Sequence, residues 1–238
     1  MSKALPEIRC DLMIVGTGLT GMAAALFAAK AGVDTVQVGL TSELNYASGL
    51  LDLMGIHPVA EQRAWTSPWA AVEQLVRDEP AHPYALLTET EMRSALTGFL
   101  DFLKRSGLPY WTDGDRNVQV ITPAGTLKST YAVPSTLVNG IRSFAAQRPC
   151  RIIDIEGLKG FSARQIVTSL GAHWPRLKAG RIAFPEALPG EQYPEHMARY
   201  LEITSGVPAW PSCIPQLNSL RDSNCSQRIP FSIKGFTV

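Results

Sequence analysis

The sequence predicts an α/β protein that begins with a Rossmann-like β-α-β unit and continues with an inserted antiparallel β segment and additional helices. Three observations carry this prediction. Apolar runs flank a glycine-rich loop and helix-forming residues over 11–40, helical periodicity follows over 67–105, and strand-like runs separated by turn residues lie between 110 and 134. At 238 residues, the chain is long enough for one large domain or two modest ones.

The β-α-β unit is predicted from residues 11–40. DLMIV at 11–15 is the first strand, Met22 to Ala31 are helix formers that Gly32 ends, and TVQVGL at 35–40 is the second strand. This order implies parallel strands joined by a right-handed crossover.

Residues 41–60 are expected to be rich in turns, and two helices are expected to follow at 67–77 and 89–105. The second helix carries Met92, Leu96, Phe99 and Leu103 at the spacing of one apolar face. We expect that face to pack into the core.

An antiparallel hairpin or small sheet is expected from VQVIT at 118–122 and TLKSTYAV at 126–133, with Pro123 and Gly125 as turn residues. Further expected elements are a short helix at 135–146, a strand at 150–157, a helix from the cap Ser162 to Gly171, a strand at 181–188 and a helix at 195–202. The expected regions are therefore 1–60, the first part of a nucleotide-binding domain; 61–206, inserted helices and a small sheet with a partial α/β continuation; and 207–238, an irregular tail.

The glycine loop lies in IVGTGLTGMAAA at 14–25, where Gly16, Gly18 and Gly21 have the spacing G-x-G-x-x-G. The first glycine permits a tight turn, the second lets the backbone approach a phosphate, and the third lets helix and strand pack closely. Because a strand precedes the loop and a helix follows it, we predict a site of the FAD- or NAD(P)-binding type. A tight turn used only for packing is the alternative.

The loop does not identify the cofactor. Dinucleotide sites usually place an acidic side chain at the end of the second strand, where it holds the ribose hydroxyls. That position falls near Val38 or Gly39, where the sequence has no acid, and Glu43 would have to reach back from an extended loop. The missing carboxylate argues against ordinary NAD binding and favours FMN or an atypically held FAD.

Composition excludes several other classes. The net charge is +1 and the basic residues are scattered, so nucleic acid is not expected as a partner. The N-terminus does not resemble a signal peptide, and no apolar run is long enough to span a bilayer, so a cytoplasmic protein is expected. The cysteines and histidines are dispersed without ligand spacings, and no metal site is predicted.

Four further stretches are ASGLLDLMG at 47–55, AHPYALL at 81–87, ITPAGTLKSTYAVPST at 121–136 and IIDIEGLKGFSARQIVTSL at 152–170. With the glycine loop, their order and intervals resemble the flavoprotein subunit, designated B, of anaerobic glycerol-3-phosphate dehydrogenase over about the first three quarters of the chain. Members of that family are considerably longer, and the proline-rich last residues do not resemble them. A C-terminally truncated chain is therefore expected.

This resemblance implies a flavin-containing subunit, generally assigned FMN, that works with two partners. These are the catalytic subunit, designated A, and the membrane-associated iron-sulfur subunit, designated C. Such complexes oxidise sn-glycerol 3-phosphate to dihydroxyacetone phosphate and pass electrons towards quinone. The resemblance also implies peripheral association with the inner membrane through a partner. A cofactor-free scaffold role is the alternative, and a free-standing NAD-linked dehydrogenase is a third reading that the absent acid counts against.

Candidate cofactor contacts beyond the glycine loop lie in two of these stretches. Ser48 and Gly49 could present backbone N–H groups to flavin, although a plain turn is nearly as good an explanation. Thr126, Lys128 and Ser129 place one cation between hydroxyls, which suits a phosphate or a flavin carbonyl. A solvated strand face is their alternative.

The catalytic residues are not predicted. His82 and Tyr84 could supply a proton donor, but Pro83 makes a structural corner in which His82 bonds to backbone the preferred interpretation. Asp52 could cap the segment that follows it.

Overall fold

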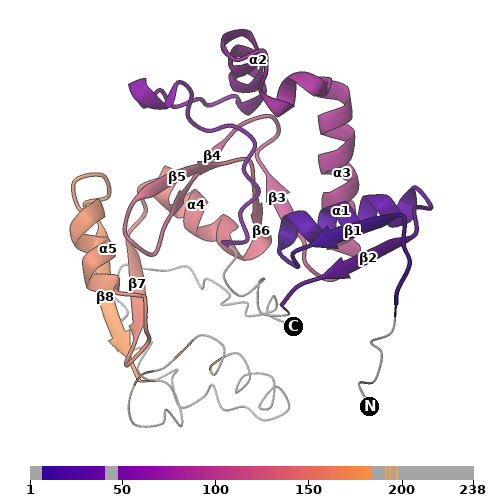
Figure 1. The fold of residues 1–238 in the computed structure, drawn as a ribbon. Coiled ribbons are helices and arrows are strands. Elements are labelled where there is room, and N and C mark those ends of the chain that lie inside the picture. The colour runs from indigo at the N-terminus through magenta and orange to yellow at the C-terminus, as the bar shows by residue number, and fades with distance from the viewer. Residues whose placement is uncertain (1–6, 41–47, 184–190, 192, 194–196, 198–238) are drawn as a thin grey trace, which may run out of the picture. The chain divides into compact units, whose positions relative to one another are not determined.

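The computed structural model of the chain describes residues 7–40, 48–183, 191, 193 and 197 (Figure 1). The chain divides into two compact units, Met1–Leu50 and Leu51–Val238, and each is described by itself. The expected tail at 207–238 and, apart from Met197, the expected helix at 195–202 lie outside the described residues. The domain boundaries expected at residues 60 and 206 stay predictions.

The first unit is the predicted β-α-β element. Strands β1 (Leu12–Val15) and β2 (Thr35–Val38) pair in parallel, from Leu12 opposite Thr35 to Val15 opposite Val38. Helix α1 (Leu19–Lys30) connects them. The helix begins earlier than the expected Met22, because the Met22 amide already donates to the Gly18 carbonyl at 3.0 Å.

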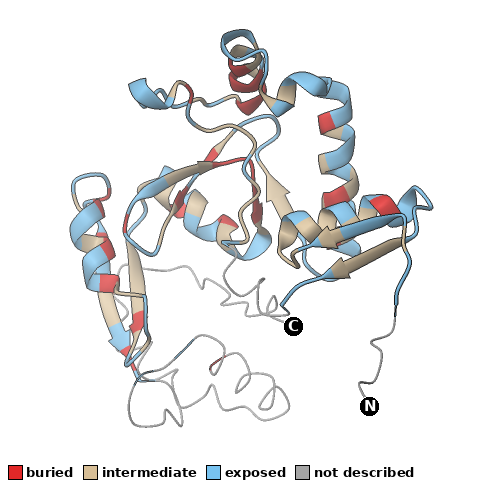
Figure 2. Ribbon diagram, viewed as in Figure 1, coloured by how far each residue is buried: buried red, intermediate tan, exposed pale blue. Residues whose placement is uncertain are grey.

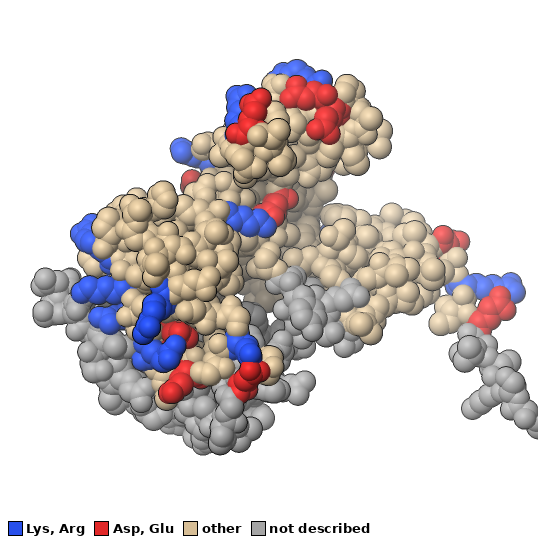
Figure 3. Space-filling model, turned by 60° about the vertical axis from the view of Figure 1, so that its left-hand side comes forward, with Lys and Arg blue, Asp and Glu red and all other residues tan. Residues whose placement is uncertain are grey.

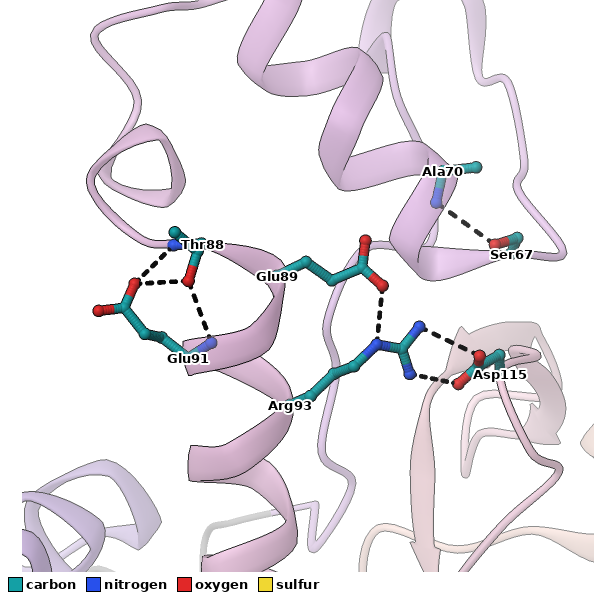
Figure 4. Close-up of polar contacts among 7 residues, drawn as sticks. All are labelled: Ser67, Ala70, Thr88, Glu89, Glu91, Arg93 and Asp115. Atoms are coloured by element: carbon teal, nitrogen blue, oxygen red, sulfur yellow. Dashed lines mark hydrogen bonds and ion pairs between the residues drawn. The ribbon is translucent and has the colours of Figure 1, made fainter.

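The first two α-helices of the second unit are α2 (Pro68–Asp78) and α3 (Glu89–Arg105), and the segment between them contains a short 3-10 helix. The Ser67 hydroxyl caps α2 by accepting a hydrogen bond from the Ala70 amide at 3.3 Å. Thr88 and Glu91 form a reciprocal capping box at the start of α3 (Figure 4). These caps fix both helix starts close to the predicted residues.

Helix α3 packs through the apolar face that the sequence predicts. Met92, Phe99 and Leu103 are buried, and Leu96 is partly buried against the core (Figure 2). On another face of the helix, Arg93 pairs with Glu89 and reaches Asp115 at 2.6 Å (Figure 4). This pairing links α3 to the turn that precedes β4.

Short antiparallel pairs follow α3. They are formed by β3 (Tyr110–Thr112), β4 (Val118–Ile121), β5 (Leu127–Thr130) and β6 (Ala132–Pro134). β4 pairs with β5 as the expected hairpin, whereas β6 pairs with β3. The run expected as one strand over 126–133 is therefore divided at Tyr131, whose ring packs edge-on against Trp69 with the centroids 5.7 Å apart.

A second parallel β-α-β element ends the described region. Helix α4 (Val138–Ala145) precedes it, and its parts are β7 (Cys150–Ile155), α5 (Ala163–Leu170) and β8 (Leu177–Ile182), with β7 and β8 paired in parallel. Short 3-10 helices occupy Val59–Glu61, Pro83–Leu86 and Ser135–Leu137.

In this element the observed helix agrees with the one predicted from the sequence, whereas the observed last strand differs from the predicted one. Ser162 caps α5 as predicted, accepting from the Gln165 amide at 3.3 Å. The strand expected at 181–188 instead begins at Leu177, because the buried residues of β8 are separated by Lys178, Gly180 and Arg181, which hide its apolar pattern. Residues 184–188 lie outside the described residues.

The core of this element lies between α5 and the two strands. Ile166, Leu170, Trp174 and Leu177 are buried together there. The Trp174 indole also donates to the Arg148 carbonyl at 2.8 Å, which joins the core to the chain that enters β7. Within the described residues, no helix combines the length and the apolar character needed to cross a membrane.

Candidate functional site

The glycine loop between β1 and α1 is the first candidate site. Gly16 has a φ of 115°, a conformation that side-chain-bearing residues rarely adopt. Its amide donates to the Val38 carbonyl at 2.7 Å, and its carbonyl accepts from the Gln37 side-chain amide at 2.8 Å. The loop is therefore fastened to the end of β2, as the tight turn after a first strand requires.

The other two glycines of the motif have different physical explanations. A Cβ on Gly21 would lie 2.2 Å from the Gly16 carbonyl oxygen, so Gly21 lets α1 pack directly on the loop. Among the described residues, a Cβ on Gly18 would meet no atom within 4 Å, and the Gly18 φ of −71° suits any residue. Neither packing among the described residues nor φ requires a glycine at this position, although a helix N-cap prefers glycine to alanine.

Gly18 is the N-cap of α1, and the first turn of that helix contains no acidic residue. The first N–H groups of a helix point outward and carry partial positive charge. Open space in front of such groups fits a phosphate, which needs close backbone approach. The residues of the loop therefore fit the phosphate end of a flavin nucleotide.

The end of β2 holds no carboxylate at Val38 or Gly39, as the sequence indicates. The Thr17 hydroxyl instead donates to the Leu40 carbonyl, and a Cβ on Gly39 would lie 2.9 Å from the Thr17 Cγ2. Glu43, the remaining acid considered for the ribose, lies outside the described residues. The edge at which an adenosine ribose usually binds is thus occupied by Thr17.

Sequence reasoning missed two polar side chains that shape this loop, Thr17 and Gln37. Both contact the backbone across the gap between the loop and β2. A glutamine inside the strand run TVQV was the available signal, because a polar side chain there requires a partner.

Ser48 and Gly49 lie in the first unit and form a turn. The Ser48 hydroxyl accepts from the Leu50 amide at 3.3 Å, and Gly49 has a φ of 70°. This local bond explains the serine without a ligand. A flavin contact of these residues stays a prediction.

The second candidate site lies in the second unit, where separate stretches of the resemblance come together. The Lys128 ammonium is 2.7 Å from the Asp52 carboxylate, and the Tyr84 hydroxyl donates to the Leu53 carbonyl at 3.1 Å. The stretches at 47–55, 81–87 and 121–136 thus share contacts. Asp52 pairs with Lys128, and a cap on its own segment stays a prediction.

The fourth stretch, at 152–170, contacts the stretch at 121–136 through the turn of the β4–β5 hairpin. A Cβ on Gly125 would lie 3.0 Å from both the Ile166 Cα and the Ser169 Cβ, so the turn between β4 and β5 packs directly on α5. The P-A-G turn is therefore required by close packing. All the later stretches that carry the resemblance belong to one contiguous set of contacts.

Each of the three predicted polar residues on or beside β5 has a protein partner. The Thr126 hydroxyl lies 2.8 Å from the Thr122 hydroxyl, closing the turn, and the Ser129 hydroxyl accepts from the Gln119 amide at 2.6 Å. Lys128 and its carboxylate partner are 40% and 46% exposed, and such ion pairs contribute little stability. Of the three, Lys128 is therefore the side chain that an anion could recruit most easily.

His82 confirms the preferred interpretation of a structural corner. Its Nδ1 accepts a hydrogen bond from the Tyr84 amide at 3.1 Å, directly after Pro83 enters a short 3-10 helix. Burial, with a smaller contribution from the Asp52 carboxylate, raises the pKa of Tyr84 above its ordinary value. Tyr84 therefore stays protonated at neutral pH.

Comparison with known proteins gives one family and several relatives. The FAD binding domain family matches residues 11–209. The anaerobic glycerol-3-phosphate dehydrogenase subunit designated B from Vibrio vulnificus is 32% identical over 165 residues, covering 68% of this chain and 37% of the relative. The protein of the same name from Vibrio cholerae is 27% identical over 182 residues, covering 76% of this chain and 41% of the relative.

These matches confirm the resemblance drawn from the sequence motifs. They also support a flavin, and FAD more directly than FMN. The chain spans about two fifths of the length of these curated relatives. No solved structure matches the chain.

Proposed function

This chain belongs to the family of FAD-binding domains, and from that premise we propose that it is a flavin-binding subunit of an anaerobic glycerol-3-phosphate dehydrogenase. The single observation that carries the binding part of the proposal is Gly18. Its glycine is required neither by φ nor by contacts with the residues that the structure describes, and a Cβ there would meet none of them within 4 Å at the start of α1. A phosphate that the backbone must approach closely supplies the missing reason.

Different residues of the first unit would have different roles in binding the phosphate. Gly16 turns the chain, Gly21 seats α1 on the loop, and the backbone at Gly18 meets the phosphate. Gln37 and Thr17 hold the loop in that shape. A bound flavin supplies hydride and electron-transfer chemistry, whereas the protein supplies orientation and electrostatics.

FMN is the flavin we propose, with FAD as the competing outcome. FMN ends at the phosphate, so it needs no partner for an adenosine ribose. The absence of an acid at Val38 and Gly39, together with Thr17 packed against Gly39, favours that shorter ligand. The family match favours FAD. Identifying the bound flavin would therefore decide between FMN and FAD.

The wider role follows from the relatives. We expect the chain to act beside the catalytic subunit and the membrane-associated iron-sulfur subunit, in oxidising sn-glycerol 3-phosphate to dihydroxyacetone phosphate. Electrons would pass towards quinone, and contact with the inner membrane would come through the partner. Within that fold, the β4–β5 hairpin would be an insertion into the flavin domain.

The first experiment is the visible absorption spectrum of the purified chain, followed by mass identification of the molecule that heat releases. Released FMN or FAD supports the flavin proposal and assigns the cofactor. A colourless protein that also fails to bind either added flavin contradicts it. In that case the scaffold role, in which the chain only docks a partner, becomes the better account.

A matched pair of variants tests the site itself. Gly18→Val places a branched side chain where we propose the phosphate, and Gly140→Val places the same side chain on α4, where a Cβ also meets no described atom within 4 Å. We expect Gly18→Val to abolish flavin retention and Gly140→Val to preserve it. Equal flavin content in the two variants would show that the phosphate lies elsewhere.

A further inference from the structure

The connection between α2 and α3 exposes a run of apolar side chains. Six of the eight residues from 80 to 87 are apolar and exposed, and we call this stretch the apolar ridge. The six are Pro80, Ala81, Pro83, Ala85, Leu86 and Leu87. Leu86 is 84% exposed, the highest fraction that any large hydrophobic side chain reaches among the described residues. Exposed apolar residues in such a run usually mark a binding surface.

Hydrogen bonds hold the apolar ridge in a fixed shape. The His82 amide donates to the Glu79 carbonyl at 2.9 Å, and the Ala85 amide donates to the His82 carbonyl at 2.8 Å. The Tyr84 ring packs against the core of the second unit, and its hydroxyl donates to the Leu53 carbonyl at 3.1 Å. The exposed side chains therefore project from a fixed backbone, which reduces the entropy lost when a partner binds.

The 3-10 helix at Pro83–Leu86 determines which side chains face the core. Because such a helix has three residues per turn, Leu86 points away from the side on which Tyr84 is packed. Leu87 has a local explanation, since it precedes the N-cap of α3, a position from which an apolar side chain can pack on Met92. Among the described residues, the exposure of Leu86 has no such local reason.

Acidic residues border the apolar ridge. The stretch 79–91 contains three glutamates, Glu79, Glu89 and Glu91, and no Lys or Arg, although the whole chain has a net charge of +1. Glu89 pairs with Arg93, whereas among the described residues Glu79 and Glu91 form no ion pair. The space-filling view shows acidic side chains, together with some basic ones, over the upper part of the second unit, where α2 and α3 lie (Figure 3).

We infer that the apolar ridge docks another protein, whose contact face has an apolar pocket bordered by Lys and Arg side chains. This inference rests on the proposed role as a subunit of a complex. Leu86 would enter the pocket, and Glu79 and Glu91 would face the basic border. In protein interfaces a buried apolar anchor supplies most of the affinity, and complementary charges around it speed association and fix the register.

Two other occupants suit the apolar ridge less well. The headgroups of an anionic bilayer would repel the glutamates, and the stretch 79–91 has no Lys or Arg to attract them. A second copy of the chain, docked through the same surface about a two-fold axis, would bring like charges together. Neither occupant supplies the positive charge that complements the acidic border.

The test uses two matched pairs of variants of the full chain. Leu86→Ser removes the proposed anchor and retains Leu87 beside the start of α3. Its control is Val59→Ser, because Val59 is 67% exposed and also lies in a short 3-10 helix of the second unit. Glu79→Gln removes one charge of the border, and Glu61→Gln removes an exposed charge outside it. Circular dichroism confirms that each variant is folded before binding is measured.

The first probe is an amphipathic helical peptide built only from leucine and lysine, which represents an apolar surface bordered by cations. We expect Leu86→Ser to bind it about tenfold more weakly than wild type and Val59→Ser, since burying one leucine contributes about that factor or more. Binding by Glu79→Gln should depend less steeply on NaCl than binding by Glu61→Gln. Equal affinity of the two serine variants, or equal salt dependence of the two glutamine variants, would overturn the inference.

Two further measurements test the competing occupants. If Leu86→Ser loses binding to phosphatidylglycerol vesicles but still binds the peptide as wild type does, the apolar ridge is a membrane surface and the inference fails. If wild type sediments as a dimer and Leu86→Ser as a monomer, with peptide binding unchanged, the occupant is a second copy and the inference also fails.

Assembly with the catalytic and iron-sulfur subunits separates this inference from the proposed function. If wild type and Val59→Ser form the complex and Leu86→Ser does not, the apolar ridge serves that assembly. If wild type does not form the complex but the peptide results hold, the proposed role in the complex fails and the docking surface stands. If wild type and Leu86→Ser assemble equally well, the apolar ridge does not dock these partners and the inference fails.

Discussion

The substitution Gly21→Ala is the most direct test of the glycine loop as a packed structure. The added Cβ would lie 2.2 Å from the Gly16 carbonyl oxygen and 3.1 Å from the Gln37 amide nitrogen. The first distance is more than about 1 Å shorter than an ordinary non-bonded contact, so α1 must shift away from the loop. Overpacking of this kind costs about 1–3 kcal/mol.

Two smaller effects modify this cost. Alanine is a better helix former than glycine by up to about 1 kcal/mol, which offsets part of the strain. The shift also threatens the hydrogen bond between Gln37 and Gly16, which contributes about 1 kcal/mol. The net expected loss is therefore about 1–3 kcal/mol for the first unit.

The control is Gly18→Ala, whose Cβ meets no atom within 4 Å at a φ that alanine adopts freely. We expect it to cost about 0.5–1 kcal/mol, because alanine is a poorer helix N-cap than glycine, and to weaken flavin binding. Amide hydrogen exchange of residues 12–38, measured without flavin, reports the stability of this unit directly. Equal protection in Gly21→Ala and wild type would refute the close packing of helix and loop.

Three further outcomes follow from single contacts. The Thr88 amide and hydroxyl hold the pKa of Glu91 below its ordinary 4.5. The stability that Glu91 adds is therefore present above pH 4.5 and is lost as pH falls through the lowered pKa. In urea unfolding from about pH 7 to about pH 3, the free energy of unfolding should decline less steeply in Glu91→Gln than in wild type. Trp174→Ala should lower the free energy of unfolding in urea by about 3–5 kcal/mol. Trp174→Phe loses mainly the indole hydrogen bond and should lower it by about 1–2 kcal/mol. Equal losses in the two variants would mean that packing is not the larger effect. Lys128→Met should change unfolding free energy by less than about 1 kcal/mol yet reduce flavin content relative to the control Lys104→Met, and unchanged flavin content would assign Lys128 a surface role only.

Local signals in the sequence are sufficient to predict most of the helices and the first strands. Helix α3 has the bounds that the sequence predicts, because Thr88 and Glu91 form a capping box and an apolar residue recurs on one face. The parallel pairing of β1 and β2 is also predictable, since a helix-length connection forces it. These features depend on residues close together in the chain.

Features that depend on distant residues cannot be predicted in the same way. Tyr131 divides one predicted strand in two because its ring packs on Trp69, far earlier in the sequence. The start of β8 escapes prediction because Lys178, Gly180 and Arg181 obscure its buried positions. Neither fact is visible from local composition or periodicity.

The predicted binding residues differ in how far the folded chain already explains them. Thr126 closes a turn, Ser129 accepts a hydrogen bond from a neighbouring strand, and Lys128 pairs with Asp52. Gly125, in the same stretch, is required by the approach of α5. A motif of this kind can arise from folding alone, so these residues support a ligand only weakly.

Gly18 is different because, among the described residues, neither a close contact nor its φ requires a glycine, and a helix N-cap merely prefers one. The residue could carry a side chain without strain or collision, and its neighbours in the motif could not. Packing against the described residues would allow a side chain at position 18, whereas a phosphate at the start of α1 requires the backbone there to be bare. The argument for a bound nucleotide therefore rests on the one glycine of the motif that neither φ nor close packing among the described residues requires, and flavin retention in Gly18→Val is the result on which it depends.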